Sequence, residues 1–153
     1  APVIVEAERV SSTLIRERIL QGDLDTVEQL LGRKYSITGE VKKGRGIGKT
    51  IGFPTANVQP HHTAIPAQGV YIAESIIDGK RYPSAVNIGI APTIRNEDIT
   101  IEAHVLDFTR DICGHQIEVL FHRRLRTEKK FSGKEALIEQ IGIDVEAVRA
   151  YFK

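Results

Sequence analysis

Residues 44–57 read Gly44-Arg45-Gly46-Ile47-Gly48-Lys49-Thr50-Ile51-Gly52-Phe53-Pro54-Thr55-Ala56-Asn57, a run of glycines and cations that ends in a Pro-Thr-Ala-Asn corner. Glycines let a backbone approach a phosphate closely, and Lys49 adds a charge that suits phosphate oxygens. Thr55 and Asn57 offer neutral oxygen atoms that Mg²⁺ accepts as ligands. Because Pro54 stops any helix that begins at Thr50, the run is not a Walker loop. The pattern predicts a phosphate-binding flap that leads into a β-strand, with a flexible basic turn as the plainer alternative.

Around this run the sequence alternates between apolar and polar residues, as β-strands do. Candidate strands cover residues 36–43, 53–58, 69–77, 81–89, 99–107 and 116–124, and Asp78-Gly79 is a candidate hairpin turn. Six short strands without intervening helices favour a closed barrel, because closure removes unpaired edges. We therefore predict a mainly β protein built on a six-stranded antiparallel closed barrel.

Helical patterns stand at both ends of the chain. Residues 11–31 predict two short helices that meet at Gly22-Asp23, with Gly32 as the stop after the second. Near the other end, Ser132 and Glu135 have the spacing of a capping box that opens a C-terminal helix. Gly142 is expected to break that helix, and Asp144 to cap a last turn or two that end near Tyr151.

The composition indicates one cytoplasmic domain. A chain of 153 residues suits a single core, and none of its apolar runs approaches the roughly 20 residues of a membrane span. Cys113 is the single cysteine, which excludes an intramolecular disulfide and fits a reducing compartment. The net charge of +1 does not argue for nucleic acid, and the five histidines show no zinc-site spacing. We expect neither a membrane nor a nucleic-acid partner.

Four motifs in this order resemble those of the riboflavin kinases. They are the run at 44–57, Asn87-Ile88-Gly89-x-x-Pro92-Thr93, Ile101-Glu102-Ala103-His104-Val105-Leu106-Asp107-Phe108, and Leu125-Arg126-x-Glu128-x-x-Phe131. The resemblance extends from about Tyr35 to the C-terminus. It implies a riboflavin kinase-like barrel that uses Mg²⁺ and ATP to phosphorylate riboflavin at the ribityl 5′-hydroxyl, which yields FMN and ADP for flavin cofactor biosynthesis.

The resemblance also implies roles for individual residues. Glu102 falls where the family keeps its general base. From the pattern alone, Thr100, Glu102 and His104 would equally suit the solvated outer face of a strand. The metal ligands are Thr55 and Asn57, and the residues on the ATP side are Gly44, Lys49, Thr55, Asn57, Val105, Asp107 and Cys113. The flavin side is Arg126, Lys129 and Phe131, for which a solvated basic face is the alternative.

The N-terminal segment carries a second resemblance. Val10-Ser11-Ser12-Thr13-Leu14-Ile15-Arg16 is similar to the Ser-Ser-Thr-x-x-Arg motif of FMN adenylyltransferases, and a helix N-cap at 11–13 is the alternative. In bacterial bifunctional FAD synthetases that module stands before the kinase. The His-x-Gly-His motif of its nucleotide-binding half has no match here. We expect residues 1–34 to be a remnant or linker of a preceding adenylyltransferase domain, residues 35–153 to form the kinase domain, and the chain to make FMN but no FAD.

Two functions from other classes stay open at this point. One is a non-catalytic barrel that binds RNA through the basic segments 42–49 and 123–130, which would want aromatic residues among the cations on the strands. The other is a flavin-nucleotide-binding module that has lost its kinase activity. The presence of Thr55, Asn57 and Glu102 argues against the second.

Overall fold

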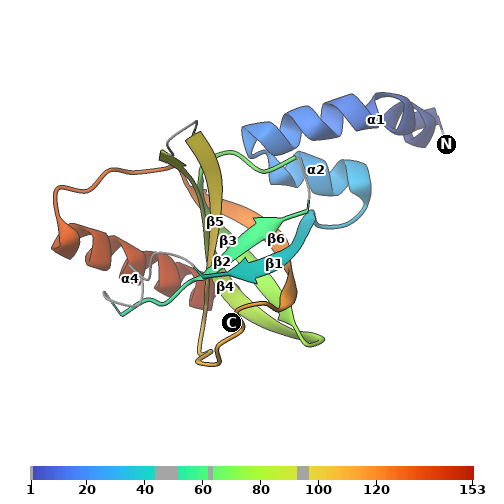
Figure 1. The fold of residues 1–153 in the computed structure, drawn as a ribbon. Coiled ribbons are helices and arrows are strands. Elements are labelled where there is room, and N and C mark those ends of the chain that lie inside the picture. The colour runs from blue at the N-terminus through green and yellow to red at the C-terminus, as the bar shows by residue number, and fades with distance from the viewer. Residues whose placement is uncertain (1, 44–51, 62–63, 93–96) are drawn as a thin grey trace.

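The computed structural model describes residues 2–43, 52–61, 64–92 and 97–153, and its centre is a closed β-barrel (Figure 1). The predicted phosphate-binding flap, with Gly44 and Lys49, lies outside these residues. The elements are α1 (Pro2–Gln21), α2 (Leu24–Leu31), β1 (Ser36–Lys42), β2 (Ala56–Pro60), β3 (Gly69–Ile77), β4 (Lys80–Pro92), β5 (Glu97–Val105), β6 (Gln116–Arg126) and α4 (Lys134–Tyr151). None of the described helices combines the length and apolar character needed to cross a membrane.

The barrel strands follow the order β1-β2-β5-β4-β3-β6, and β6 pairs with β1 to close the ring. All neighbours are antiparallel, as the alternating pattern predicted. Asp78 and Gly79, at φ 50° and 80°, form the tight turn between β3 and β4, where left-handed backbone favours glycine. Several strand boundaries differ from the prediction by up to three residues: β2 begins at Ala56, so residues 53–55 approach the barrel as irregular chain, and β4 continues to Pro92.

Inward-facing side chains fill the barrel. Tyr71 and Phe121 are among the largest of them, and their rings meet edge to face with centroids 5.4 Å apart. Burial raises the pKa of Tyr71 to about 12. Strand β5 shows the alternation clearly: Ile101 and Ala103 are fully buried inside, whereas Glu102 between them faces outward and is half-buried.

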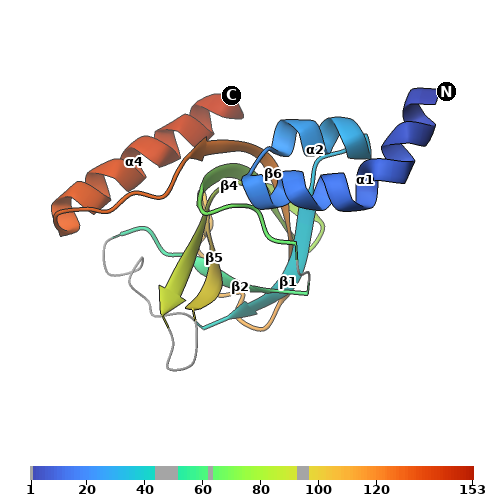
Figure 2. The same ribbon diagram turned by 90° about the horizontal axis from the view of Figure 1, so that it is seen from above.

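Helix α4 covers part of the barrel's outer wall. Val145 and Val148 of α4 pack against Ile72 of β3 and Ala85 of β4, with Phe53 at the margin of this second apolar cluster. Figure 2 shows α4 on a different side of the barrel from α1 and α2. Strands β3 and β4 are thus covered on both faces over part of their length.

The predicted details of α4 are wrong in three respects. The helix continues through Gly142, because its packed apolar stripe outweighs the roughly 1 kcal/mol cost of one glycine. Gly133 is the N-cap residue and no side chain caps the helix, so Ser132 and Glu135 form no capping box. Asp144 lies within the helix and is buried rather than capping a last turn.

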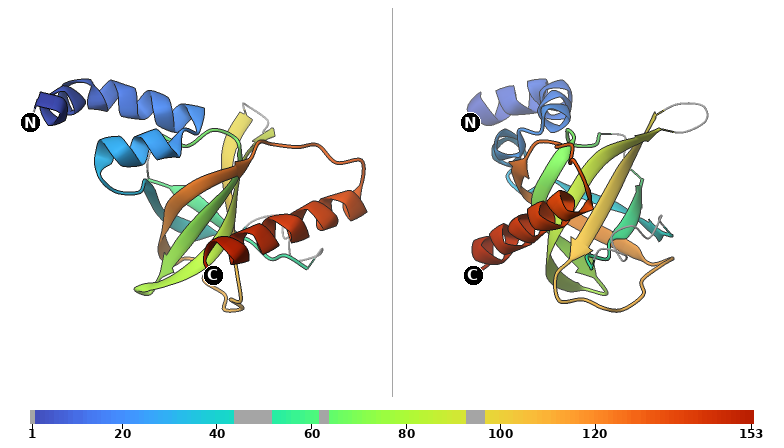
Figure 3. Two further views of the ribbon diagram at one scale, coloured as in Figure 1. Left: turned by 180° about the vertical axis from the view of Figure 1, so that it is seen from behind. Right: turned by 90° about the vertical axis from the view of Figure 1, so that its left-hand side faces the viewer.

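The N-terminal helices pack onto the barrel. They meet at Gly22-Asp23, and Gly32 ends α2 in left-handed conformation, as predicted. Helix α1 begins at Pro2 and includes residues 11–13, so the predicted N-cap there is wrong. Leu24 of α2 belongs to the same buried cluster as the barrel core. Figure 3 shows this helix pair beside one end of the barrel, away from most of α4.

Candidate functional site

A row of polar residues crosses three neighbouring strands on the outer face of the barrel. Asn57 of β2 is paired with Glu102 of β5, and Glu102 is paired on its other side with Asn87 of β4. Residues directly opposite each other in antiparallel strands project their side chains to the same face. The next pairs in the register continue this row to Val70 of β3 and Arg126 of β6.

The chain that leads into β2 is fastened to β5 beside this row. The Nδ1 atom of His104 lies 2.8 Å from the Pro54 carbonyl oxygen, to which it donates a hydrogen bond. The His104 ring also meets the Phe53 ring edge to face, with centroids 5.5 Å apart. Two contacts therefore fix the segment immediately before Thr55. Thr55 itself is exposed, and Asn57 is half-buried.

Arg126 marks the other end of the row, where β6 meets α4. Its guanidinium forms a forked ion pair with Asp144, with Nη2 2.8 Å and Nε 3.1 Å from carboxylate oxygens. Gln140 donates a further hydrogen bond to Asp144 at 3.0 Å. The Asp144 side chain is only 5% exposed, so this carboxylate is a buried anchor for Arg126.

The structure brings together the three residues predicted to bind flavin. The Phe131 ring lies 5.9 Å from the Arg126 guanidinium carbon and 5.8 Å from Lys129 Nζ. Both distances are within the range of cation–π attraction. Arg126, Lys129 and Phe131 therefore form one cluster between the end of β6 and α4.

Three residues predicted for the ATP side lie along the chain from the end of β5 onward. Val105 is 6% exposed and packs in the barrel core. Asp107 is exposed and forms two hydrogen bonds, of 2.9 and 3.0 Å, with Arg149 of α4, and this contact lowers the pKa of its carboxyl. Cys113 is exposed, and its backbone N–H donates to Asp111. Their predicted contact with ATP stays a prediction.

The cations of segment 123–130 make several contacts within the protein. Besides Arg126, Arg124 donates to the Gln68 carbonyl, and Arg123 stacks over the Tyr151 ring at 5.7 Å. Lys129 lies 3.4 Å from Gln140 Oε1. These contacts hold the cations against the barrel and α4.

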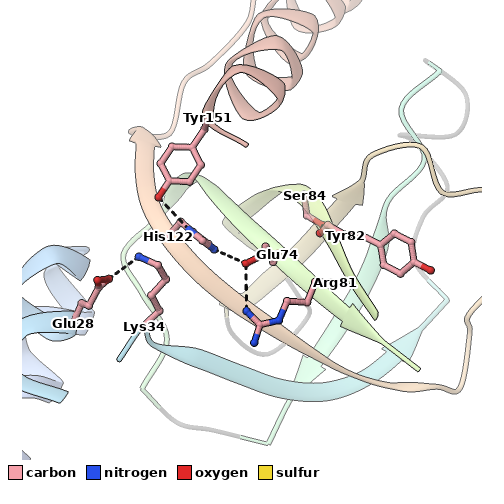
Figure 4. Close-up of polar contacts among 8 residues, drawn as sticks. All are labelled: Glu28, Lys34, Glu74, Arg81, Tyr82, Ser84, His122 and Tyr151. Carbon is pink, nitrogen blue, oxygen red and sulfur yellow. Dashed lines mark hydrogen bonds and ion pairs between the residues drawn. The ribbon is translucent and has the colours of Figure 1, made fainter. Parts of the chain in front are cut away.

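A polar cluster that the sequence analysis missed joins the end of α4 to the barrel (Figure 4). Nε2 of His122 donates to Glu74 at 2.7 Å, and Nδ1 lies 3.1 Å from the Tyr151 hydroxyl. Arg81 reaches the same Glu74 carboxylate at 3.7 Å. The four residues of this polar cluster come from β3, β4, β6 and α4, so no local sequence motif could reveal the cluster. Within the part of the chain that the structure describes, no group of three or more histidine, cysteine or acidic side chains could hold a metal ion.

Asn87 is the residue of the row that the sequence analysis quoted without giving it a role. Its Oδ1 is buried, and no donor among the described residues reaches it. Its neighbours along β4, Val86 and Ile88, point into the core. Asn87 therefore stands on the site face, next to Glu102.

Comparison with protein families gives a match to the model described as "Flavokinase: Riboflavin kinase" over residues 31–152. The bifunctional riboflavin kinase/FMN adenylyltransferase of Pseudomonas fluorescens is 40% identical over 149 residues, which make up 97% of this chain and 48% of that protein. The enzyme of the same name from Escherichia coli K12 is 37% identical over 145 residues, or 94% of this chain and 46% of that protein. The chain spans about half the length of these curated relatives.

Solved structures give two further likenesses. A crystal structure from Streptococcus pneumoniae, described as a macrolide-efflux protein, superposes with a TM-score of 0.86 at 35% identity. The superposition covers 92% of this chain and 46% of that one. Riboflavin kinase from Trypanosoma brucei superposes with a TM-score of 0.56 at 23% identity, over 78% of this chain and 80% of that one. The second likeness concerns the fold alone.

Proposed function

Because this chain belongs to the riboflavin kinase family, we propose that it transfers the γ-phosphoryl group of ATP to the ribityl 5′-hydroxyl of riboflavin and so forms FMN and ADP. The observation that carries the residue assignments is the strand register. It puts Asn57, a candidate metal ligand, beside Glu102, the candidate base. Both face the same side of the sheet, where metal, phosphate and hydroxyl would have to meet.

Glu102 is the general base of the proposed reaction. Its carboxylate takes the proton of the 5′-hydroxyl as the oxygen attacks the γ-phosphorus, and the bond from that phosphorus to the β–γ bridging oxygen breaks. Glu102 is half-buried on the outer face, where a substrate can reach it. The rigid barrel fixes its position, since its two strand neighbours are fully buried.

Thr55 and Asn57 would hold Mg²⁺ with the phosphates. Their hydroxyl and amide oxygens are hard ligands of the type that Mg²⁺ takes in small number from a protein, leaving other positions to phosphate and water. The bond from His104 to the Pro54 carbonyl supports this fit, since it fastens the approach to Thr55. When bound, the ion would neutralise charge on the transferring phosphoryl group.

The flavin would lie toward Arg126, Lys129 and Phe131. From Glu102 the row crosses three strand intervals to Arg126, a span of roughly 14 Å at ordinary strand spacing. A tricyclic ring with a five-carbon chain can bridge such a distance. The Phe131 ring and its two cations offer the flavin an aromatic and charged wall.

The ATP side is proposed on the family resemblance. Gly44 and Lys49, in the flap outside the described residues, would cover the phosphates, while Val105, Asp107 and Cys113 would lie toward adenine. Val105 is buried in the core and would contribute through its backbone. Asp107 presents its carboxylate to Arg149. ATP and flavin would thus approach Glu102 from opposite sides.

The relatives' second activity suggests the wider setting of this chain. We infer that residues 35–153 are the kinase domain and that residues 1–34 connect it to an adenylyltransferase domain in a bifunctional enzyme. The proposed partners are riboflavin, ATP, FMN and ADP, with neither nucleic acid nor membrane. A cytoplasmic location stays a prediction.

One assay tests the proposed function. The purified chain is incubated with riboflavin, ATP and Mg²⁺, and the products are separated by chromatography. We expect FMN and ADP in equal amounts, no FAD, and loss of FMN formation when EDTA removes the metal. Flavin binding without FMN formation would instead support a non-catalytic flavin-binding barrel.

A further inference from the structure

The Oδ1 atom of Asn87 is a buried acceptor that lacks a donor among the residues that the structure describes. Buried polar atoms are nearly always hydrogen-bonded, and an unpaired one lowers stability. Asn87 is not needed to fill the core, because its side chain is on the outer face of β4. An unpaired acceptor that lowers stability, on the same face as Glu102, suggests that a bound ligand supplies the missing donor.

The register shows where that ligand would lie. Asn87 is directly paired with Glu102 on one side and with Val70 on the other, and Val70 is paired with Arg126. It therefore stands roughly 5 Å, one strand interval, from Glu102 toward the flavin side. Val70 is 6% exposed and offers no hydrogen-bonding side chain. Within this row, Asn87 is the polar contact between the base and Arg126.

No side chain projects from β4 at the position next to Asn87 on the same face, because that residue is Gly89. Gly89 lies two residues along β4 on the same face. A methyl group at Gly89 would come within 3.4 Å of Thr100 Oγ1 and 3.5 Å of Glu128 Oε2. Because Gly89 has no side chain, none stands between these polar groups and Asn87 at this position.

We propose that Asn87 accepts a hydrogen bond from a secondary hydroxyl of the ribityl chain, so that it selects flavins with a polyhydroxylated side chain. The inference rests on the proposed function, since it takes the 5′-hydroxyl to be at Glu102. The ribityl chain then runs from Glu102 toward the ring and passes Asn87. Its secondary hydroxyls can donate to Oδ1, whereas a phosphate oxygen or a ring carbonyl cannot.

The test compares riboflavin with a 10-(5-hydroxypentyl) flavin, which keeps the terminal hydroxyl and lacks the secondary ones. The parent chain should prefer riboflavin by at least about 10-fold in kcat/KM, because the analogue loses the hydrogen bond to Asn87 together with any contacts of the other two secondary hydroxyls. Asn87→Leu should reduce this preference by about 10-fold, the effect of one lost hydrogen bond at a buried group. Asn57→Ala is the matched control: it should lower kcat/KM for both flavins by a similar factor and keep their ratio.

Stability gives a second readout that a merely structural role would not produce. Because Oδ1 is unpaired without ligand, Asn87→Leu should keep or raise the Tm while the preference falls. If Asn87→Leu does not fold, Asn87→Ala supplies the same comparison. An unchanged preference in a folded Asn87 variant would overturn the inference.

The failure of the proposed function would look different. If the parent makes no FMN, the flavin's own fluorescence can follow binding of the two flavins. A parent that binds riboflavin at least about 10-fold more tightly, with that difference reduced by about 10-fold in Asn87→Leu, supports the contact without catalysis. Equal binding of the two flavins by the parent overturns it.

Discussion

The neighbours of Glu102 support its proposed role as general base. An acidic residue on the outer face of a strand is usually a solvated surface group, and the alternation of β5 alone allows that interpretation. Here the register places an amide on each side of Glu102, from Asn57 and Asn87, and the side chain is half-buried. A carboxylate flanked by two amides on a rigid strand can be oriented toward one substrate oxygen, which is what a general base requires.

Replacing Glu102 with Gln should slow the chemical step while the substrates still bind. Gln keeps the shape and one acceptor oxygen but cannot take the proton, and loss of a general base typically lowers a rate by on the order of 10²–10⁴. Single-turnover formation of FMN, measured beside riboflavin and ATP affinities, checks this. Glu118→Gln is the control, since Glu118 is paired with Thr38 and Ile76, outside the row. Equal turnover in Glu102→Gln and the parent would mean that Glu102 is only a solvated residue on the outer face of β5.

At this scale the motifs select candidate residues and leave their surroundings open. Residue type and order in the motifs select Thr55, Asn57 and Glu102 as candidates, and their roles stay predictions. The position of Asn87 next to Glu102 depends on the register of β4 against β5, which no motif contains. Periodicity shows which face a residue takes and leaves open which residue stands opposite.

Helix α4 links the structural and the proposed functional parts of the molecule. Its apolar side chains cover the outer wall of β3 and β4, and Asp144 in the same helix binds Arg126 at the end of the row. The sequence-based interpretation divided this helix at Gly142 because glycine and aspartate there match stop and cap signals. The helix is continuous because tertiary packing and the buried ion pair of Asp144 stabilise it, and neither is visible in the local sequence.

Asp144→Ala should therefore destabilise the protein and weaken flavin binding together. The change removes the forked bonds to Arg126 and the bond from Gln140, and leaves a partly buried guanidinium without its carboxylate partner. We expect a loss of about 2–4 kcal/mol in the free energy of unfolding, measured by urea denaturation. Riboflavin affinity should fall because Arg126 loses its fixed orientation.

The neighbouring Glu146→Ala is the matched control for Asp144. Glu146 is in the same helix, its side chain is 77% exposed, and its contact with Arg149 is long at 3.9 Å. Its replacement should alter the free energy of unfolding by less than about 0.5 kcal/mol. If both variants unfold alike, the Asp144–Arg126 pair does not anchor the helix.

Two features determine the architecture of the whole molecule: the pairing of the barrel strands, and the packing of the N-terminal helices onto the barrel. Alternating residues and turn signals predicted six antiparallel strands, and closure followed because open edges are unfavourable. The packing of the N-terminal helices could not be predicted in the same way. Their apolar faces were visible in the sequence, yet the surface that each face covers depends on the assembled barrel.

Leu24 tests whether the N-terminal helices are part of this structure or only attached to it. The family match begins at residue 31, yet Leu24 is 5% exposed and belongs to the barrel's core cluster. Leu24→Ala would leave a cavity where α2 meets the barrel, and such changes cost about 2–5 kcal/mol. We expect a loss in that range, seen as one cooperative transition by both tyrosine fluorescence and circular dichroism.

Leu20→Ala provides the comparison, because this leucine of α1 is 53% exposed and its truncation should change stability by less than about 0.5 kcal/mol. A similar small effect at both leucines would mean that residues 1–34 are held only loosely. A large effect at Leu24 alone would mean that the kinase barrel needs α2 to complete its core. The structural domain would then begin before the residue 35 boundary predicted from the motifs, because burial of apolar surface, and not motif order, sets where a folding unit starts.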